Sequence, residues 1–188
     1  MAPALRLLPG AFTVEMYHKL GELGVFHEDD RVELINGQIV PMSPIGDAHA
    51  ACVQRLNTYL NHRTTLPVIV SMQNPVVLHP RLEPQPDIAV LRREAGLAGR
   101  WHATARDVLL IAEVADSSLP YDRDVKIPQY AEAGIPETWL VDLNADRITV
   151  YRDPGAEGYR HVVTVSRSEM LRPLRLPETT ITADEILG

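Results

Sequence analysis

The chain has 188 residues, of which 45% are hydrophobic, so we expect one domain, residues 1–188, with a substantial core. A net charge of −7 argues against a protein that coats nucleic acid non-specifically, although it leaves room for a local basic groove. No segment approaches the roughly 18 consecutive apolar residues that span a bilayer. We therefore expect a cytoplasmic protein without a membrane partner. The single cysteine, Cys52, excludes an internal disulfide, and its helical context predicts a buried thiol.

The N-terminal part of the chain predicts a helix, a hairpin and a second helix. Apolar residues at helical spacing favour a short amphipathic helix over residues 13–23, and Gly24 would end it. In "RVELINGQIV", two apolar arms flank Asn36 and Gly37, the dipeptide that best supplies the positive φ angles of a tight turn. This pattern predicts a β-hairpin. Asp47 then precedes a second apolar stripe, which predicts a longer helix capped by that aspartate.

From Pro67 onward the sequence is typical of strands, with only one further helix expected. The strand-like segments are "PVIVSM", "PVVLH", "DIAVL", "DVLLIAEVA", "ETWLVDL", "RITVYR" and "RHVVTV". In "VKIPQYAEAG", Pro128 would break a helix interior but is tolerated in a first turn. That helix should therefore begin near Lys126 or Ile127, with Gly134 as its C-terminal cap. The expected fold is mixed α/β (α+β), a curved mixed sheet flanked by a few helices.

Two acidic residues occupy strands that are otherwise apolar. Asp87 directly precedes "IAVL", and Glu113 lies toward the end of "DVLLIAEVA". If these consecutive strands pair in antiparallel fashion, the start of one lies beside the end of the next, so the two carboxylates become neighbours. A crossover connection remains an alternative. Neighbouring carboxylates on apolar strands repel one another unless a proton or a cation neutralises them, and a divalent metal ion is the economical solution.

Lys126, at the expected start of the later helix, adds a cation to this acidic pair. Carboxylate oxygens are suitable ligands for Mg²⁺ or Mn²⁺, a bound metal ion activates water, and a lysine stabilises developing phosphate charge. These residue types therefore favour phosphodiester hydrolysis. The sequence contains no G-x-x-x-x-G-K-[ST] loop, no H-E-x-x-H and no paired C-x-x-C, so nucleotide switching and zinc catalysis have no sequence support.

An ordered series of motifs resembles the Uma-two family of restriction endonucleases. The matching segments are "VELINGQIVPMSP", followed by His49, then "PDIAVL", "IAEVADSS" and "YDRDVKIPQYAEAGIPETWLVD", which together cover roughly residues 13–152. The resemblance implies a restriction-endonuclease-like fold of the PD-(D/E)XK superfamily, with Asp87 and Glu113 as metal ligands. It also implies nucleic acid, DNA in particular, as the substrate. A homodimer or higher oligomer is expected on the same ground, because a duplex has two strands to cut.

The catalytic lysine departs from the superfamily's simplest pattern. Ala115 stands two residues after Glu113, where that pattern has a lysine, and in the resembling family a helical lysine takes its place, here Lys126. A long flexible side chain can bring its ammonium to the same point from another anchor. Glu33 matches the family's "E-L-I-x-G" element as a third acid, although a solvent-facing glutamate would fit strand alternation equally well.

Four further residues are candidates for lining the site: Gln85, His49, Tyr121 and Arg123. Gln85 lies two residues before Asp87 and so on the same strand face. His49 falls in the first turn of the longer helix, where helix capping or partial burial competes with a direct catalytic role. Tyr121 and Arg123, with Asp122 between them, precede the later helix and are expected to support Lys126 or to meet a phosphate.

The loop between the two acidic strands contains Arg92, Arg93, Arg100 and Trp101, which would either grip a nucleic acid or form a solvated loop. The remaining aromatic residues, including Tyr130 and Trp139, are interpreted as core. We thus expect a Mg²⁺- or Mn²⁺-dependent nuclease with Asp87, Glu113, Lys126 and Glu33 in its active site. Two alternatives stay open: an inactive nucleic-acid-binding module of the same fold, and a small-molecule phosphodiesterase.

Overall fold

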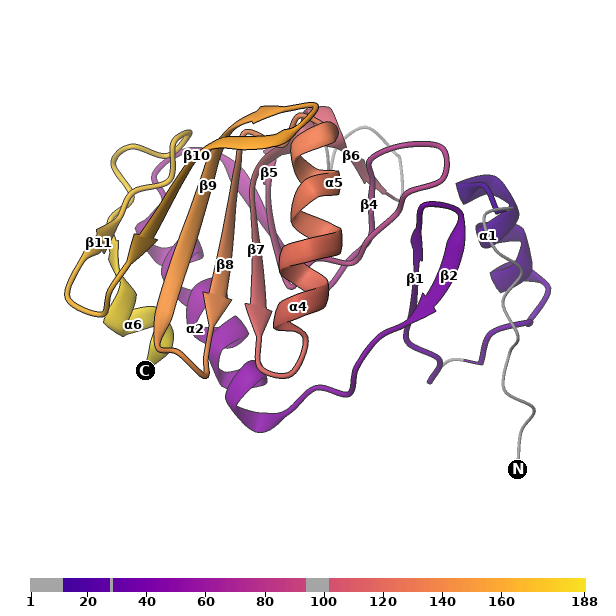
Figure 1. The fold of residues 1–188 in the computed structure, drawn as a ribbon, viewed down its shortest axis with the longest axis horizontal. Helices are drawn as coiled ribbons and strands as arrows, with labels where there is room; N and C mark the ends of the chain where they lie inside the picture. The colour runs from indigo at the N-terminus through magenta and orange to yellow at the C-terminus, as the bar shows by residue number, and fades with distance from the viewer. Residues whose placement is uncertain (1–11, 28, 94–101) are drawn as a thin grey trace.

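A six-stranded mixed sheet forms the centre of the computed structural model, which describes residues 12–27, 29–93 and 102–188 (Figure 1). The strand order is β10-β9-β8-β7-β5-β3. The strands are β3 (Val68–Met72), β5 (Ile88–Arg92), β7 (Val108–Ala115), β8 (Glu137–Asp142), β9 (Arg147–Gly155) and β10 (Gly158–Val165). All neighbours pair in antiparallel fashion except β7 and β8, which are parallel. The predicted mixed α/β fold with a mixed sheet is confirmed.

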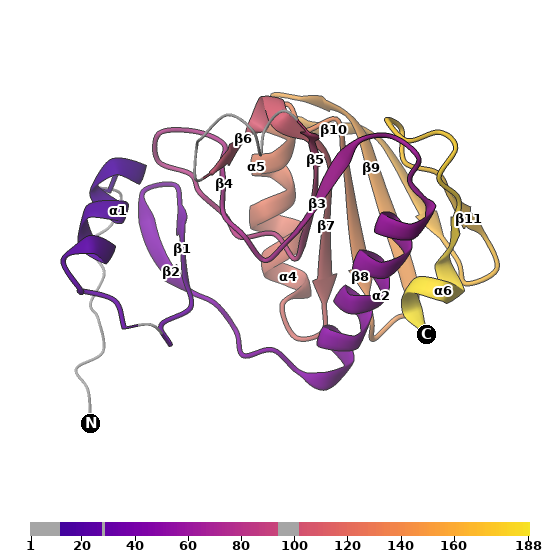
Figure 2. The same cartoon turned by 180° about the vertical axis from the view of Figure 1, so that it is seen from behind.

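Helices cover both faces of this sheet. The helix α5 (Ile127–Glu132) lies on the face shown in Figure 1, whereas α2 (Asp47–Arg63) and α6 (Ala183–Leu187) lie on the opposite face, shown in Figure 2. Because β7 is covered on both sides, all of its residues are buried, as expected for a central strand. The thiol of Cys52 is buried between α2 and the sheet, as predicted. No helix within the described ranges is long and apolar enough to cross a membrane.

The predicted N-terminal helix and hairpin are both present at one end of the sheet. They are α1 (Val14–Glu22), β1 (Val32–Ile35) and β2 (Gln38–Pro41). Asn36 and Gly37 have φ values of 50° and 76°, the positive angles that a tight hairpin turn requires. A two-way backbone bridge between Leu34 and Glu83 ties the hairpin to the segment that enters β5. The hairpin is thereby held beside the start of an acidic strand.

Short elements complete the fold. Two small two-stranded sheets pair β4 (Val76–Val77) with β6 (Ala103–Thr104) and β11 (Met170–Leu171) with β12 (Ile181–Thr182). A short 3-10 turn, η1 (Ala105–Asp107), leads into β7. After β7 the chain enters α4 (Leu119–Tyr121) and the wide helical turn η2 (Asp122–Lys126), which continues directly into α5.

The helix α5 begins at Ile127, with Lys126 as its N-cap residue and Pro128 in its first turn, as predicted. The turns before it were not predicted: α4 and η2 lead into α5 without a break, so the helical segment as a whole begins at Leu119. The turn before the proline is a π-turn, in which the Ile127 N–H donates to the Asp122 carbonyl five residues back. Proline lacks an N–H and its ring crowds the carbonyl four residues earlier, and the widened turn relieves that conflict. The position of Pro128 thus predicted the start of α5 but not the helical turns that precede it.

Two other predictions about helices are wrong. Asp47 is not the cap of α2: Gly46 is the N-cap, and Asp47 lies in the first turn, where a negative charge stabilises the helix dipole. The expectation of only one further helix after the strands missed α6. The signal for α6 was present in the sequence, because Thr182 and Glu185 form a capping box at its start.

We expect Glu185→Gln to destabilise the fold by about 1 kcal/mol at pH 7, because Glu185 pairs with Arg63 and so ties α6 to α2. The hydrogen bond from Arg63 lowers the pKa of Glu185 to about 2. Because the pKa of Glu185 is lower in the folded protein than in the unfolded chain, the ionised carboxylate stabilises the fold at any pH above the unfolded-state pKa. This contribution is lost as the pH falls to about 2. Urea unfolding of both proteins should therefore converge in acid, and a difference that does not change with pH would contradict the assignment.

Candidate active site

A pocket of about 340 Å³ lies between the hairpin, the start of α2, the end of β7 and the helix that follows. Its lining includes every predicted site residue except Arg123: Glu33, His49, Gln85, Asp87, Glu113, Tyr121 and Lys126. These side chains come from five separate parts of the sequence. The fold thus gathers the candidates into one cavity.

The two central acids lie side by side, as the strand argument predicted. Strands β5 and β7 are antiparallel, and Ile88 is the partner of Ala112, so Asp87 stands at the entry of β5 beside Glu113. The Asp87 N–H lies 3.3 Å from Glu113 Oε2, and the Val114 N–H donates to Asp87 Oδ2 at 2.9 Å. Both carboxylates are buried. The predicted antiparallel pairing is confirmed, and the alternative of a crossover connection is wrong.

Lys126 brings its ammonium group between two acids. Its Nζ lies 3.2 Å from Glu113 Oε1 and 3.3 Å from Glu33 Oε2, and the side chain is only 5% exposed. Burial lowers the pKa of Lys126, but the charges of Glu113 and Glu33 outweigh burial and raise it overall. Lys126 therefore carries a positive charge. Its ammonium group reaches the site from the helical segment after β7 and not from β7 itself.

Glu33 is a buried member of this group, 2% exposed, so the alternative of a solvent-facing glutamate is wrong. It lies on β1 and reaches the pocket because the bridge between Leu34 and Glu83 docks the hairpin there. The Gln85 N–H donates to Glu33 Oε2 at 3.1 Å, while the Gln85 side chain donates to the Val32 carbonyl at 3.0 Å. Gln85 thus fixes the position of Glu33 while lining the pocket.

His49 approaches the site from the first turn of α2. Its Nε2 lies 3.0 Å from Asp87 Oδ2. The hydrogen bond to Asp87 raises the pKa of His49. Burial raises the pKa of Asp87, but hydrogen bonds from His49, Val114 and Gln73 outweigh burial and lower it overall. His49 is thus partly buried, and its contact with Asp87 keeps that carboxyl ionised.

The surroundings of Glu113 raise its pKa, whereas those of Asp87 lower the pKa of that carboxyl. Complete burial, together with the charges of Asp122 and Asp87, raises the pKa of Glu113 to about 8, although Lys126 acts in the other direction. Ionisation of Glu113 is thus unfavourable mainly because the carboxyl is buried near other acids, and a bound cation would offset this free-energy cost. Oxygen donors from Asp87 and Glu113 suit Mg²⁺ or Mn²⁺, so the donor set fits the implied metal.

Tyr130 and Gln73 contribute to this site although the sequence analysis assigned them no such role. Tyr130, interpreted as a core aromatic, is buried but donates its hydroxyl to Glu113 Oε1. Asp122, which was expected to support Lys126, is buried near it and accepts a 2.5 Å hydrogen bond from Ser118. Gln73, in the left-handed region with φ of 49°, donates to Asp87 at 3.3 Å. Tyr130 follows Lys126 by four residues and so shares its helix face, a signal available in the sequence.

Arg123 does not line the pocket, because its exposed guanidinium pairs with the neighbouring Asp124. Arg92 and Arg93, from the predicted loop between the two acidic strands, do not line the pocket either. Arg92 lies at the end of β5 opposite to Asp87 and donates to the Arg106 carbonyl, and Arg93 is exposed. Arg100 and Trp101 lie outside the described residues. Arg31, which no sequence motif indicated, is instead the arginine that lines the pocket.

Comparison with known proteins identifies the family and the fold of the chain. A family model for Uma2, described as "Putative restriction endonuclease", matches residues 14–184. Among solved structures, the chain is similar to a "putative nuclease belonging to DUF820" from Anabaena variabilis, with a TM-score of 0.73 and 15% identity over 94% of this chain and 97% of that chain. At this identity the likeness shows the fold. A comparison with curated proteins finds no match. The family description indicates a restriction-type nuclease, and because the family match covers most of the sequence, the chain belongs to the Uma2 family.

Proposed function

We propose that this protein is a nuclease that hydrolyses phosphodiester bonds of DNA with the help of Mg²⁺ or Mn²⁺. The observation that carries the proposal is the cluster of Asp87, Glu113 and Lys126, three buried ionisable groups from different elements that meet at one pocket. Buried charges are costly, and a functional site is where such an arrangement is expected.

Asp87 and Glu113 would hold the divalent ion. When bound, the ion would supply an activated water molecule and neutralise charge on the scissile phosphate. Asp87 is suited to this role because His49, Val114 and Gln73 all donate hydrogen bonds that favour its ionised form. Tyr130, through its hydroxyl, fixes the orientation of the Glu113 carboxylate.

Lys126 would orient the attacking water and stabilise the charge that develops on the phosphate. Glu33 shares the ammonium of Lys126 with Glu113, so it keeps that group charged and in place. Glu33 is thus proposed as a positioning residue for Lys126 as well as a third acid of the site.

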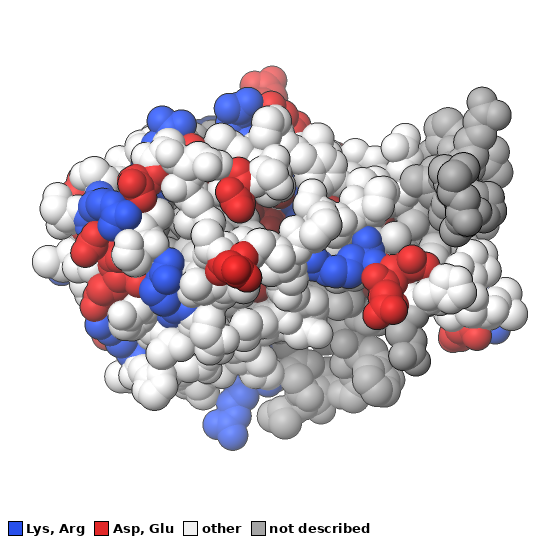
Figure 3. Space-filling model, turned by 90° about the horizontal axis from the view of Figure 1, so that it is seen from below, with Lys and Arg blue, Asp and Glu red and all other residues white. Residues whose placement is uncertain are grey.

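The protein would bind nucleic acid through a few basic residues near the pocket rather than through an extended basic surface. Figure 3 shows the lower face of the molecule, where basic and acidic side chains of the described residues are interspersed. Arg31 lines the pocket and donates to the Ser43 carbonyl at 3.1 Å, which leaves further guanidinium N–H groups for a phosphate. A second copy of the chain would bring a second active site to the other strand of a duplex.

The test is an incubation of the purified protein with single- and double-stranded DNA and RNA and with a model phosphodiester. Each substrate is offered with Mg²⁺, with Mn²⁺ and with excess chelator. We expect cleavage of DNA that requires the metal ion. Cleavage of RNA alone would change the substrate, and cleavage of the model compound alone would indicate a small-molecule phosphodiesterase. Binding of nucleic acid without cleavage under any condition would indicate an inactive binding module and overturn the proposal.

A further inference from the structure

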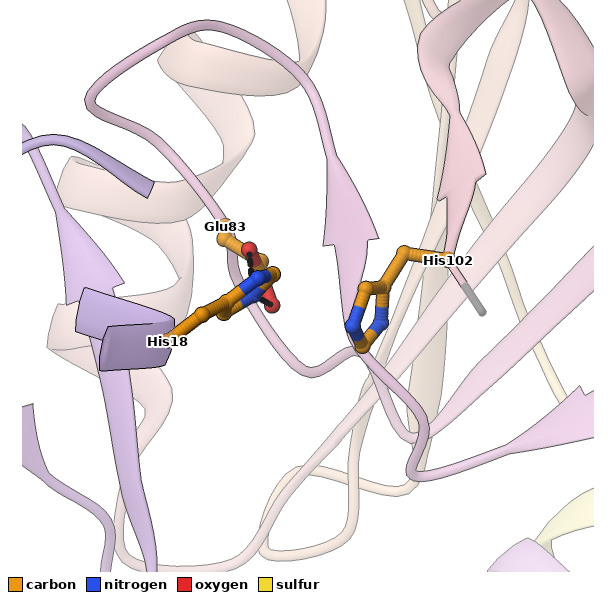
Figure 4. Close-up of side chains that lie close together, drawn as sticks. All are labelled: His18, Glu83 and His102. Atoms are coloured by element: carbon orange, nitrogen blue, oxygen red, sulfur yellow. Dashed lines mark hydrogen bonds and ion pairs between the residues drawn. The ribbon is translucent and has the colours of Figure 1, made fainter. Parts of the chain in front are cut away.

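A second group of metal-ligating side chains lies outside the acidic pocket. His18, Glu83 and His102 each offer one ligand atom, and these atoms all lie within 4.8 Å of one another. Figure 4 shows that the three side chains approach from separate segments: His18 from α1, Glu83 from the chain before β5, and His102 from the residue before β6. Residues so distant in sequence cannot be recognised as a set by any spacing motif.

We propose that His18, Glu83 and His102 form a binding site for a transition-metal ion of the Zn²⁺ class. Two imidazoles and one carboxylate are a donor set that proteins use for Zn²⁺, with a water molecule as the fourth ligand. The nitrogen donors distinguish this set from the all-oxygen acids of the first pocket, which suit Mg²⁺ or Mn²⁺. The two sites would therefore select different ions.

The geometry is close to what such an ion requires. His18 Nε2 already lies 2.8 Å and 2.9 Å from the two oxygens of Glu83. The rings of His18 and His102 are 4.7 Å apart between centroids. Ligand atoms around a tetrahedral ion with bonds of about 2.0–2.2 Å lie roughly 3.5 Å apart. Small side-chain rotations would close the set without a change in the backbone.

One atom of the cluster has no other explanation among the described residues. The Nδ1 of His102 is buried and has no hydrogen-bond partner in the part of the chain that the structure describes. The hydrogen bond between His18 and Glu83 explains why these two side chains are adjacent, but it does not explain why the imidazole of His102 lies beside them. A metal ion would use both rings together with the carboxylate.

Glu83 is a suitable anchor for the ion. It is buried, and its backbone is held by the two-way bridge to Leu34 of the hairpin. A pocket of about 330 Å³ borders all three ligands and leaves space for a water ligand. Gln85 lines both pockets, so the two sites flank the same short segment. A bound ion would cross-link α1 to the chain that carries Gln85 and Asp87, which gives it a structural role.

The test uses tag-free protein stripped of metal and titrated with Zn²⁺ in competition with a coloured chelator. We expect one Zn²⁺ per chain, bound at least tenfold more weakly by His18→Ala and by His102→Ala. His62→Ala is the matched control, because this exposed histidine of α2 lies outside the cluster. Zn²⁺ should raise the melting temperature of the wild-type protein and of His62→Ala but not of His18→Ala. Excess Mg²⁺ should not displace the ion.

Two results would overturn the proposal. The first is absence of Zn²⁺ binding by the wild-type protein. The second is binding that survives in both His18→Ala and His102→Ala, above all if His49→Ala abolishes it, since that would assign the ion to the acidic pocket. Circular dichroism checks that each variant folds. His18 is the safer position, because its side chain is 35% exposed and its removal leaves no large cavity.

Discussion

Asp87→Ala should reduce metal-dependent DNA cleavage at least about 100-fold, because it removes one of two carboxylates proposed to hold the ion. Glu113→Gln should have an effect of similar size. The amide side chain is nearly isosteric, so the fold should survive, but it cannot ionise to bind the metal ion. Initial rates of cleavage and Mn²⁺ binding by titration calorimetry measure the two consequences separately. Both should fall together if the ion and the reaction share this pocket.

Asp124→Ala is the matched control for these variants. Asp124 is an exposed carboxylate two residues before Lys126, and it pairs with Arg123 outside the pocket. Its removal should leave cleavage and Mn²⁺ binding unchanged. Cleavage at the wild-type rate by both Asp87→Ala and Glu113→Gln would refute the assignment and point to a contaminating nuclease or to another site.

Lys126→Met should destabilise the protein by about 3–5 kcal/mol at pH 9, because it leaves buried Glu33 and Glu113 without their cation. The loss should be smaller at pH 6. The raised pKa of Glu113, about 8, keeps this carboxyl protonated and neutral at pH 6, whereas in the wild-type protein it ionises beside the ammonium above about pH 8. The variant has no such partner, so the difference between the two proteins should grow with pH.

Urea unfolding at both pH values measures this difference, and added Mn²⁺ should restore part of the stability by neutralising the same carboxylates. Lys19→Met, at the other lysine of the chain, is the control. Lys19 is 65% exposed and pairs with Glu22 on α1, so its loss should have little effect. An equal loss of stability at both pH values, with no response to Mn²⁺, would mean that Lys126 contributes only packing.

Local sequence rules predicted the parts of the site that depend on strand geometry. Asn36 and Gly37 define the hairpin that carries Glu33, because few other dipeptides accept two positive φ angles. Antiparallel pairing of two consecutive strands sufficed to bring Asp87 and Glu113 together. In the hairpin a short stretch of sequence determines the geometry, whereas the pairing of β5 with β7 was one of two connections that the sequence allowed. On each strand the side-chain period of two fixes which residues face the same side.

The predictions failed where a position depends on distant contacts. Tyr130 has the composition of a core residue, and only the packing of its helix on β7 shows that its hydroxyl reaches Glu113. Gln73 reaches Asp87 because it adopts an unusual backbone conformation after β3. The approach of His18 to His102 depends on how α1 docks against the chain before β6. Periodicity places Tyr130 on the helix face of Lys126, but the partners of Tyr130, Gln73 and His18 depend on tertiary packing.

The π-turn before Pro128 affects how this sequence should be aligned with others. A π-turn accommodates one residue more than an α-turn, so the chain from Asp122 to Ile127 contains an insertion that a regular helix would lack. An alignment that matches this helix to a regular one without a gap would shift Lys126 by one position, about 100° around the helix axis. The lysine would then seem to be missing from its site, although its ammonium lies between Glu33 and Glu113.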